Sequence, residues 1–392
     1  MILNPAYSLA VATTADGDRY VITDGTDQLH AASSWLQFLT NTGKSPNTVK
    51  HYGARVAWYL SWTVLTSDWR EVSLHHIALW RRVVSNTPVL KTNGEEMFRS
   101  PKTVALWMTP VRSFYEWADS QDLVSSDVAR RLTQVKYFAP GSPAGGEHGA
   151  HRQVLAAELR VPGAQTELSD PDWIDDPRAR AELETIELKS RDRFLIDLMY
   201  FTGIRVGEAL SLFIEDLHFG GGSAELRCHV TEPHFHVRTD NRVENGARAK
   251  GQARLLYASE DLIDRYVDYA IERSKKLGEL DRSPHVFVSI YTFGESRGAA
   301  MKYSGVSKLI AICSRRIRFK LSGPHMLRHT FATRLVRGID CEPQPLETVQ
   351  DLLGHRSINS TKVYTHDLET AKKKALAAIA PRRLHLGEIE QR

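Results

Sequence analysis

The chain is poor in cysteine and has no long apolar run. Its 392 residues contain three cysteines, Cys228, Cys313 and Cys341, which lie far apart and form no Cys-x-x-Cys pair. This spacing predicts free thiols in a reducing compartment and excludes a disulfide framework. No apolar stretch approaches the roughly 20 residues that a membrane helix needs. The first residues show no basic segment followed by an apolar run, so we expect no signal peptide and a cytoplasmic protein.

Acidic residues are missing from one long stretch. Between Met301 and Ile339 there are nine lysines and arginines and no Asp or Glu, although the whole chain has a net charge of only +4. Such a run usually forms a solvated face. A polyanionic partner is the better interpretation here, because the stretch also contains His325, Arg328 and His329.

A segment rich in glycine and proline divides the chain. The length of the chain, 392 residues, favours two domains over a single core. Residues 138–149 hold glycine and proline at a density that cannot sustain a helix or a central strand, which predicts a flexible connector. We therefore assign residues 1–26 to an N-terminal extension, 27–135 to a small helical domain, 136–177 to a linker and 178–392 to a second domain with a helical tail.

Capping residues mark the helices of the smaller domain. Ser45, Ser73 and Ser100 each precede an amphipathic segment, and proline follows the first and last of them at the first helical position. An earlier helix should carry an apolar stripe that includes Leu29 and Leu36, and the last helix should bury Leu106. Residues 20–23 predict a short strand.

The second domain is predicted to be helical around a small antiparallel sheet. Residues 191–201 form an amphipathic helix, with Gly203 as its left-handed C-terminal residue. Segments 225–230, 235–238 and 254–257 have the composition of strands. Helices are expected at 262–274 and 371–379. The predicted fold class is therefore a multidomain, mainly α protein with a small antiparallel β-sheet.

Two arginines, two histidines and a tyrosine stand in order in this domain. Pro324 fixes a helix start that places His325 and Arg328 on one face, and His355 and Tyr364 follow at a spacing of nine residues. An earlier arginine, Arg205, follows a Thr-Gly turn. Guanidinium groups can clamp phosphate oxygens, imidazoles can move protons, and a tyrosine oxygen can hold a covalent phosphoryl group. The set is suited to attack on a phosphodiester.

Simpler interpretations exist for each of these residues. A basic helix face is usually solvated, and a tyrosine beside an apolar residue usually belongs to the core. His325 and His329 have the spacing of metal ligands, but no glutamate lies between them and no third ligand is evident. His234 and His236 alternate on an expected strand, and no cysteine or acidic residue has metal-site spacing to them. We expect no metal and no other cofactor.

The strings at residues 202–209, 324–330 and 353–366 resemble those of the tyrosine recombinases, or phage-type integrases. The resemblance covers residues 27 to 380. It implies a helical, SAM-like core-binding domain and a mixed α/β catalytic domain clamped around duplex DNA. It also implies that Tyr364 attacks the scissile phosphate, that Arg205 and Arg328 stabilise the developing charge, that His325 relays the tyrosine proton, and that His355 holds a phosphate oxygen.

Two further residues follow from the resemblance. Glu208 is expected to orient an arginine rather than to react. The lysine that protonates the leaving oxygen maps to Lys250, which is the only lysine between Lys189 and Lys275. The stretch from Gly220 to Ala249 is longer than in compact members of the family. The sequence around Lys250 is similar to that of transposon-encoded members.

The family implies partners as well. We expect specific sites on double-stranded DNA, a homo-tetramer on DNA, a tail that packs onto a neighbouring protomer, and a possible need for accessory proteins. Lys44, Lys50 and Lys102 are expected to contact DNA from the smaller domain. Two alternatives stay open at this point: a type IB topoisomerase, which shares the chemistry, and a DNA-binding protein that has lost its catalysis.

Overall fold

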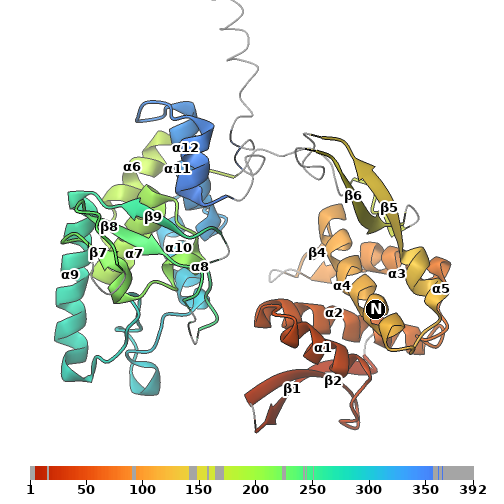
Figure 1. Cartoon of the computed structure of the whole chain (residues 1–392). Coiled ribbons are helices and arrows are strands. Elements are labelled where there is room, and N and C mark those ends of the chain that lie inside the picture. Colours follow the sequence, from red (N-terminus) through yellow and green to blue (C-terminus); the bar gives the residue numbers. More distant parts are fainter. Residues whose placement is uncertain are drawn as a thin grey trace, which may run out of the picture. The chain divides into compact units, whose positions relative to one another are not determined.

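The computed structural model is mainly helical, with small antiparallel sheets, as the sequence predicts (Figure 1). It describes residues 5–364 except 16, 91–93, 141–147, 157–158, 164–171, 223–226, 242, 244, 250, 356–360 and 362–363. The chain divides into two compact units, Met1–Glu167 and Leu168–Arg392. Among the helices that the structure describes, none has the length and apolar character to cross a membrane.

The first unit is a helical group with short hairpins at its edges. Its described elements are β1 (Tyr7–Thr14), β2 (Gly17–Asp24), α1 (Ala32–Asn41), α2 (Pro46–Val64), α3 (Leu74–Asn86), β3 (Val89–Leu90), β4 (Glu96–Met97), α4 (Pro101–Ser120), α5 (Ser126–Leu132), β5 (Thr133–Phe138) and β6 (Ala150–Leu155).

The predicted caps are confirmed. The side chains of Ser45, Ser73 and Ser100 each accept a hydrogen bond from the backbone N–H three residues later, which satisfies one of the free donors at the start of α2, α3 and α4. The predicted burial is wrong at two positions: Leu29 lies before α1 and Leu106 faces solvent, and both are at least half exposed. The caps are local and could be predicted, whereas the buried face depends on neighbouring helices.

The N-terminal residues belong to the core of the first unit. The predicted strand at residues 20–23 lies in β2, which pairs antiparallel with β1. Ile22 of β2 is fully buried among the side chains of α1 and α2. The segment before residue 27 therefore packs on the helical unit and is not a separate extension.

The glycine- and proline-rich stretch does not separate the two units. It joins β5 to β6, which pair along six residues from Thr133↔Leu155 to Phe138↔Ala150. The unit boundary falls later, between Glu167 and Leu168. The boundary lies within the predicted linker, 136–177, but the stretch 138–149 that was taken as its clearest part joins two paired strands of the first unit, because glycine and proline occur between paired strands as readily as in a linker.

The second unit contains helices around a three-stranded antiparallel sheet with the order β7-β8-β9. Its described elements are α6 (Pro177–Thr185), α7 (Ser190–Thr202), α8 (Val206–Ala209), η2 (Ile214–Asp216), β7 (Leu217–His218), β8 (His234–Val237), β9 (Arg254–Tyr257), α9 (Glu260–Leu277), η3 (Gly278–Leu280), η4 (Gly294–Ser296), α10 (Tyr303–Arg316), α11 (Pro324–Arg337) and α12 (Leu346–Leu353).

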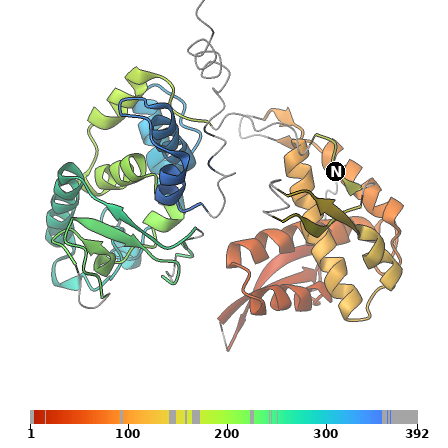
Figure 2. The same cartoon turned by 45° about the horizontal axis from the view of Figure 1, so that its top comes forward.

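The central helix of this unit is α7. Phe194, Leu195, Leu198 and Met199 are all buried, because α9 packs on one side of α7 and α11 on another. Helix α11 packs on α7, and α12 packs on α11; both are blue in Figures 1 and 2. This packing brings the ends of α7, α11 and α12 together.

The predicted sheet is correct for two of its three strands. Segments 235–238 and 254–257 correspond to β8 and β9. The third segment, 225–230, is wrong in its described part: residues 227–230 lie in the connection between β7 and β8 and in none of the described strands, while 225 and 226 lie outside the described residues. The third strand is β7, whose two residues are too few for an alternating pattern to show.

Candidate active site

Arg328 is a buried guanidinium that holds the ends of two helices. It lies in α11, which begins at Pro324, and its side chain is 2% exposed. Nη1 donates to the Gly203 carbonyl at the end of α7 at 2.7 Å, and Nη2 donates to the Leu353 carbonyl at the end of α12 at 2.6 Å. Terminal carbonyls of a helix lack an intrahelical donor and carry partial negative charge, so they suit a cation.

Arg205 is held by Glu208 one turn further on. Arg205 is the N-cap of α8, and its Nη1 donates to Glu208 Oε1 at 2.7 Å while its backbone N–H donates to Oε2 at 3.0 Å. A third residue, Arg254 of β9, donates to Oε2 at 2.8 Å. Glu208 is fully buried. The predicted contact of Glu208 with an arginine is present, and Arg254 is a second partner that the sequence did not indicate.

The two predicted arginines meet at one carbonyl oxygen. Arg205 Nη1 lies 3.2 Å from the Leu353 oxygen, which also accepts from Arg328 at 2.6 Å. Their guanidinium groups are therefore neighbours, although 123 positions separate them in the chain. Glu208 is the carboxylate among these side chains, so three guanidiniums against one carboxylate leave two positive charges. Such a site favours an anion.

The protonation equilibria reflect this excess of positive charge. Burial, together with the charge of Arg205, lowers the pKa of Arg328 to about 9. Burial alone would raise the pKa of Glu208, but the hydrogen bond and charge of Arg254, together with Arg205, outweigh it and lower that pKa. Glu208 is thus ionised near neutral pH.

Glycines allow the backbone to approach these side chains. Gly203 and Gly354 end α7 and α12 with φ of 64° and 60°. A Cβ on Gly203 would lie 2.3 Å from Phe331 Cδ1, and one on Gly251 would lie 2.8 Å from the Gly354 oxygen and 2.6 Å from Arg205 Nη1. The backbone at Gly251, the residue after Lys250, therefore lies against the arginine cluster.

His355 lies directly after α12, as expected from its place behind Gly354. Its ring is buried, and Nδ1 lies 3.0 Å from the Thr361 hydroxyl oxygen. Its backbone N–H donates to the Gln350 carbonyl at 3.1 Å, and its carbonyl accepts from Gln350 Nε2 at 3.0 Å. Burial, with the charge of Arg328, lowers the pKa of His355 to about 3. The ring is neutral at pH 7 and fixed in orientation.

Tyr364 is buried against α11 and α12. Its side chain is 2% exposed and packs with Ala332, Val349 and Leu353. Its hydroxyl oxygen lies 3.0 Å from His329 Nδ1. Burial raises the pKa of Tyr364 and lowers the pKa of His329 to about 4. A neutral phenol thus faces a neutral imidazole that can accept its proton.

The histidine beside the tyrosine differs from the expected one. The sequence analysis gave His325 the role of proton relay, whereas His329 is the histidine that contacts Tyr364. His325 is exposed in the first turn of α11, with its ring centroid 6.0 Å from that of His329. The i, i+4 spacing puts both rings on one face, and only the packing of Tyr364 distinguishes them.

The other predicted site residues are in less informative places. Lys250 and the tail at 371–379 lie outside the described residues. Lys44, Lys50 and Lys102 are exposed near the starts of α2 and α4 in the first unit. Arg254 and the partner of Tyr364 were missed, because neither has a signal in local spacing.

These features define an anion site with an adjacent tyrosine, and the comparisons agree with it. Residues 178–371 match the model of the phage integrase family. The chain belongs to this family, whose members are also called tyrosine recombinases, and is therefore an enzyme that breaks and rejoins DNA strands.

Curated relatives match along most of their length. The chain is 27% identical to transposase A from transposon Tn554 of Staphylococcus aureus over 367 residues, which cover 88% of this chain and 90% of the relative. It is 27% identical to tyrosine recombinase XerC of Oceanobacillus iheyensis over 351 residues, which cover 89% and 94%.

Solved structures share the fold. The XerH site-specific recombinase in a post-cleavage complex with difH substrate aligns with a TM-score of 0.57 at 17% identity, over 90% of this chain and 86% of that chain. The Tn1549 transposon integrase in complex with transposon right end DNA aligns with a TM-score of 0.55 at 16% identity, over 88% and 98%.

Proposed function

We propose that this chain is a site-specific DNA recombinase of transposon type that cuts and rejoins duplex DNA through a 3′-phosphotyrosyl link on Tyr364. The observation that carries the proposal is the meeting of Arg205 and Arg328 at the Leu353 carbonyl. This cluster has two uncompensated positive charges. Tyr364 packs with Leu353, the residue whose carbonyl oxygen accepts from both arginines. A scissile phosphate fits both the charge and the fork geometry of the donors.

The steps conserve atoms and charge. The Tyr364 oxygen bonds to phosphorus, its proton passes to His329, and the bond from phosphorus to the 5′ oxygen breaks. Arg205 and Arg328 stabilise the charge on the non-bridging oxygens, because preorganised donors need no reorientation during the reaction. His355 holds one of those oxygens, and exposed His325, whose ring centroid lies 6.0 Å from that of His329, relays the proton onward. Religation reverses the steps, so neither ATP nor a metal at the reacting phosphate is required.

Lys250 is the proposed acid for the leaving 5′ oxygen. The support is its neighbour: Gly251 packs against Arg205 and Gly354, so the chain passes the cluster at this point. Glu208 is a positioning residue that holds Arg205 and Arg254 and touches no reacting atom in this scheme.

The proposed assembly is a homo-tetramer on two DNA sites, with Lys44, Lys50 and Lys102 contacting the backbone. The resemblance to the Tn554 transposase supports a mobile element as the source. The proposed location is the cytoplasm, and some sites are proposed to need accessory proteins.

Covalent trapping tests the proposal. Duplex fragments from the source genome, nicked to prevent religation, should yield protein-linked DNA that survives denaturant, and sequencing it gives the cleavage site. Tyr364→Phe should bind but form no link, whereas Tyr303→Phe, which changes an exposed tyrosine, should behave as wild type. A link of wild-type level in Tyr364→Phe would refute the nucleophile.

A second assay separates recombination from topoisomerase activity. A recombinase should convert two copies of the recovered site into recombinant product. A brief treatment with EDTA before the reaction should leave this product unchanged, because no metal is proposed at the reacting phosphate. Relaxation of a plasmid that lacks the site, with no recombinant, would instead support a type IB topoisomerase. Tight binding with no covalent product would support a protein that has lost catalysis.

A further inference from the structure

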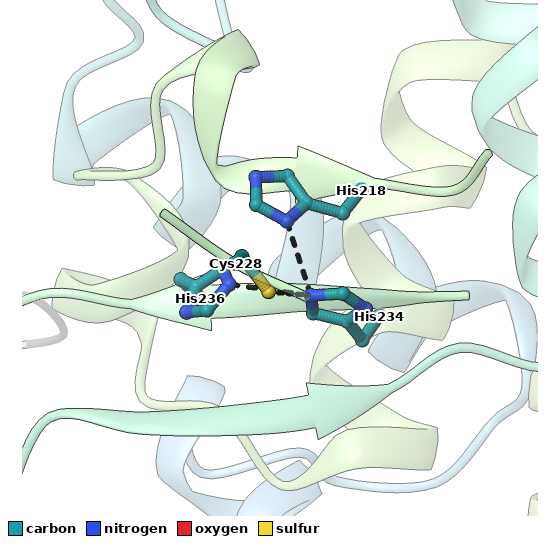
Figure 3. Close-up of side chains that lie close together, drawn as sticks. All are labelled: His218, Cys228, His234 and His236. Carbon is teal, nitrogen blue, oxygen red and sulfur yellow. Dashed lines mark hydrogen bonds between the residues drawn. The ribbon is translucent and has the colours of Figure 1, made fainter. Parts of the chain in front are cut away.

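The sheet of the second unit brings together side chains that the proposed chemistry does not use. His218 of β7, His234 and His236 of β8, and Cys228 in the connection between the strands place one ligand atom each within 4.8 Å of one another (Figure 3). The sequence analysis found no partner with metal-site spacing for His234 and His236. That conclusion is wrong in the folded chain, because strand pairing places His218 next to these histidines and a loop places Cys228 there.

Strand pairing explains how the histidines meet. His218 lies directly opposite His234 in the antiparallel register of β7 and β8. His236 is two residues along the same strand, so its side chain is on the same face. The connection returns Cys228 to this face, and Gly222 allows it: a Cβ there would lie 2.2 Å from the Cys228 carbonyl oxygen.

The hydrogen bonds fix which ring nitrogens carry protons. His234 Nδ1 lies 2.7 Å from the Glu232 carbonyl oxygen, and His218 Nε2 lies 3.1 Å from that of Glu215. A carbonyl oxygen can only accept, so these two nitrogens are the donors. In neutral rings, His218 Nδ1 and His234 Nε2 then carry lone pairs.

The remaining geometry does not suit hydrogen bonding alone. His234 Nε2 lies 3.0 Å from His218 Nδ1, 3.2 Å from Cys228 Sγ and 3.2 Å from His236 Nε2. One lone pair cannot accept from three groups, and it repels the lone pair of His218. Figure 3 shows the three atoms directed at this nitrogen. A cation between the four atoms would turn these contacts into bonds.

We infer that His218, Cys228, His234 and His236 bind one Zn²⁺ ion as a structural site. Zinc prefers imidazole nitrogen and thiolate sulfur in a tetrahedron, whose neighbouring donors lie roughly 3.3–3.6 Å apart. The three printed distances from His234 Nε2, 3.0–3.2 Å, are slightly shorter, and all four ligand atoms lie within 4.8 Å of one another, so small shifts would suffice to bind the ion. Backbone carbonyls that accept from the outer N–H groups of the rings are the usual support of zinc-bound histidines. Four protein ligands leave no position for substrate, so the ion has a structural role.

The ion would stabilise the long connection between β7 and β8. The two strands pair only at Leu217↔Phe235 and His218↔His234. These two pairs give little support to the connection of fifteen residues, 219–233, that joins the strands. Zinc would link the two strands and the loop in one cluster. It would thereby also fix β8, which pairs with β9, the strand of Arg254.

Metal analysis of the purified full-length chain tests the inference. Protein from zinc-supplemented cells should retain about one zinc per chain after gel filtration. Cys228→Ser and His236→Ala should lower zinc affinity by at least about tenfold, a loss known even for outer partners of zinc ligands. Cys341→Ser and His229→Ala are matched controls, because both change exposed residues outside the four ligands, and they should retain zinc.

Cobalt substitution tests the geometry and the thiolate ligand of the site. Co²⁺ added to the metal-free wild type should give visible bands of a tetrahedral site and a thiolate charge-transfer band, and the latter should vanish in Cys228→Ser. Removal of zinc should lower the melting temperature. Wild-type protein with no bound zinc and no cobalt bands would overturn the site, as would equal zinc in the ligand variants and the controls. Tyr364→Phe should keep its zinc, so a failure of the recombinase proposal would not affect this result.

Discussion

Arg328 shows how one residue can serve both the fold and the site. Its two Nη atoms donate to the ends of α7 and α12, and burial, together with the charge of Arg205, lowers its pKa to about 9. A bound phosphate would relieve that repulsion. The site is therefore already shaped and charged for an anion before DNA arrives.

Replacement of Arg328 by lysine should slow cleavage with little effect on binding. Lysine keeps the positive charge, but its single ammonium group cannot replace the planar guanidinium, which donates to two helix ends and to a phosphate at once. We expect a loss of roughly 3 kcal/mol, or about 100-fold, in the single-turnover rate. Arg315→Lys, an exposed change in α10, is the control. Equal rates in both variants would remove Arg328 from the chemistry.

Replacement of Glu208 by glutamine should affect stability as well as rate. The fully buried carboxylate compensates Arg205 and Arg254, and loss of one partner of a buried pair costs about 3–5 kcal/mol. Urea unfolding should show a large loss, while Glu347→Gln, at an exposed site on α12, should show almost none. A stability equal to wild type would mean that the arginines find another partner.

Half-buried His329 and buried His355 predict a loss of stability in acid. Folding lowers the pKa of His329 to about 4 and that of His355 to about 3, against about 6.5 in an unfolded chain. The unfolded state then binds more protons, so the free energy of unfolding should fall as the pH drops from about 6.5 towards 4 and 3. His329→Gln should flatten this dependence, and exposed His75→Gln should not. Parallel pH curves for the three proteins would contradict the shifts.

At the scale of elements, glycine turns determine how closely the helices approach. Gly203→Ala should destabilise the second unit by about 2–4 kcal/mol, because it adds left-handed strain to an overlap with Phe331. Gly298→Ala is the control, since φ there is also positive, at 80°, but a Cβ would meet Leu277 only at ordinary distance. Equal losses in thermal unfolding would show that the Phe331 contact carries no cost.

The elements also show what the sequence could predict. Serine caps and the start at Pro324 depend on neighbours within four residues, so those helices could be predicted. Residues 138–149 were misread as the connector between domains, because their composition does not reveal that β5 and β6 pair. In the site, the motifs indicated Arg205 and Arg328. Arg254 and the metal cluster depend on which strands and loops meet, which no local pattern contains.

At the scale of the molecule, the two units should share one DNA duplex. Its phosphates release counterions when lysines neutralise them, so affinity should fall steeply with salt. Lys44→Ala, Lys50→Ala and Lys102→Ala should each reduce the slope of log affinity against log salt by about one unit. Lys275→Ala on α9 is the control, and anisotropy of labelled DNA is the measurement. An unchanged slope would assign these lysines to the solvated surface.

The burial of Tyr364 has a consequence for the cell that carries this enzyme. A genome presents millions of phosphodiesters to any DNA-bound protein, and each is a possible target for an exposed tyrosine oxygen. Here the tyrosine residue is 2% exposed, and its hydroxyl oxygen is engaged by His329. Under the proposed mechanism, random collisions with DNA should therefore leave the chromosome intact, and a cut should require that the segment bearing Tyr364 first move. The time spent in that moved arrangement, more than the strength of DNA binding, would set how often the host suffers an unwanted nick.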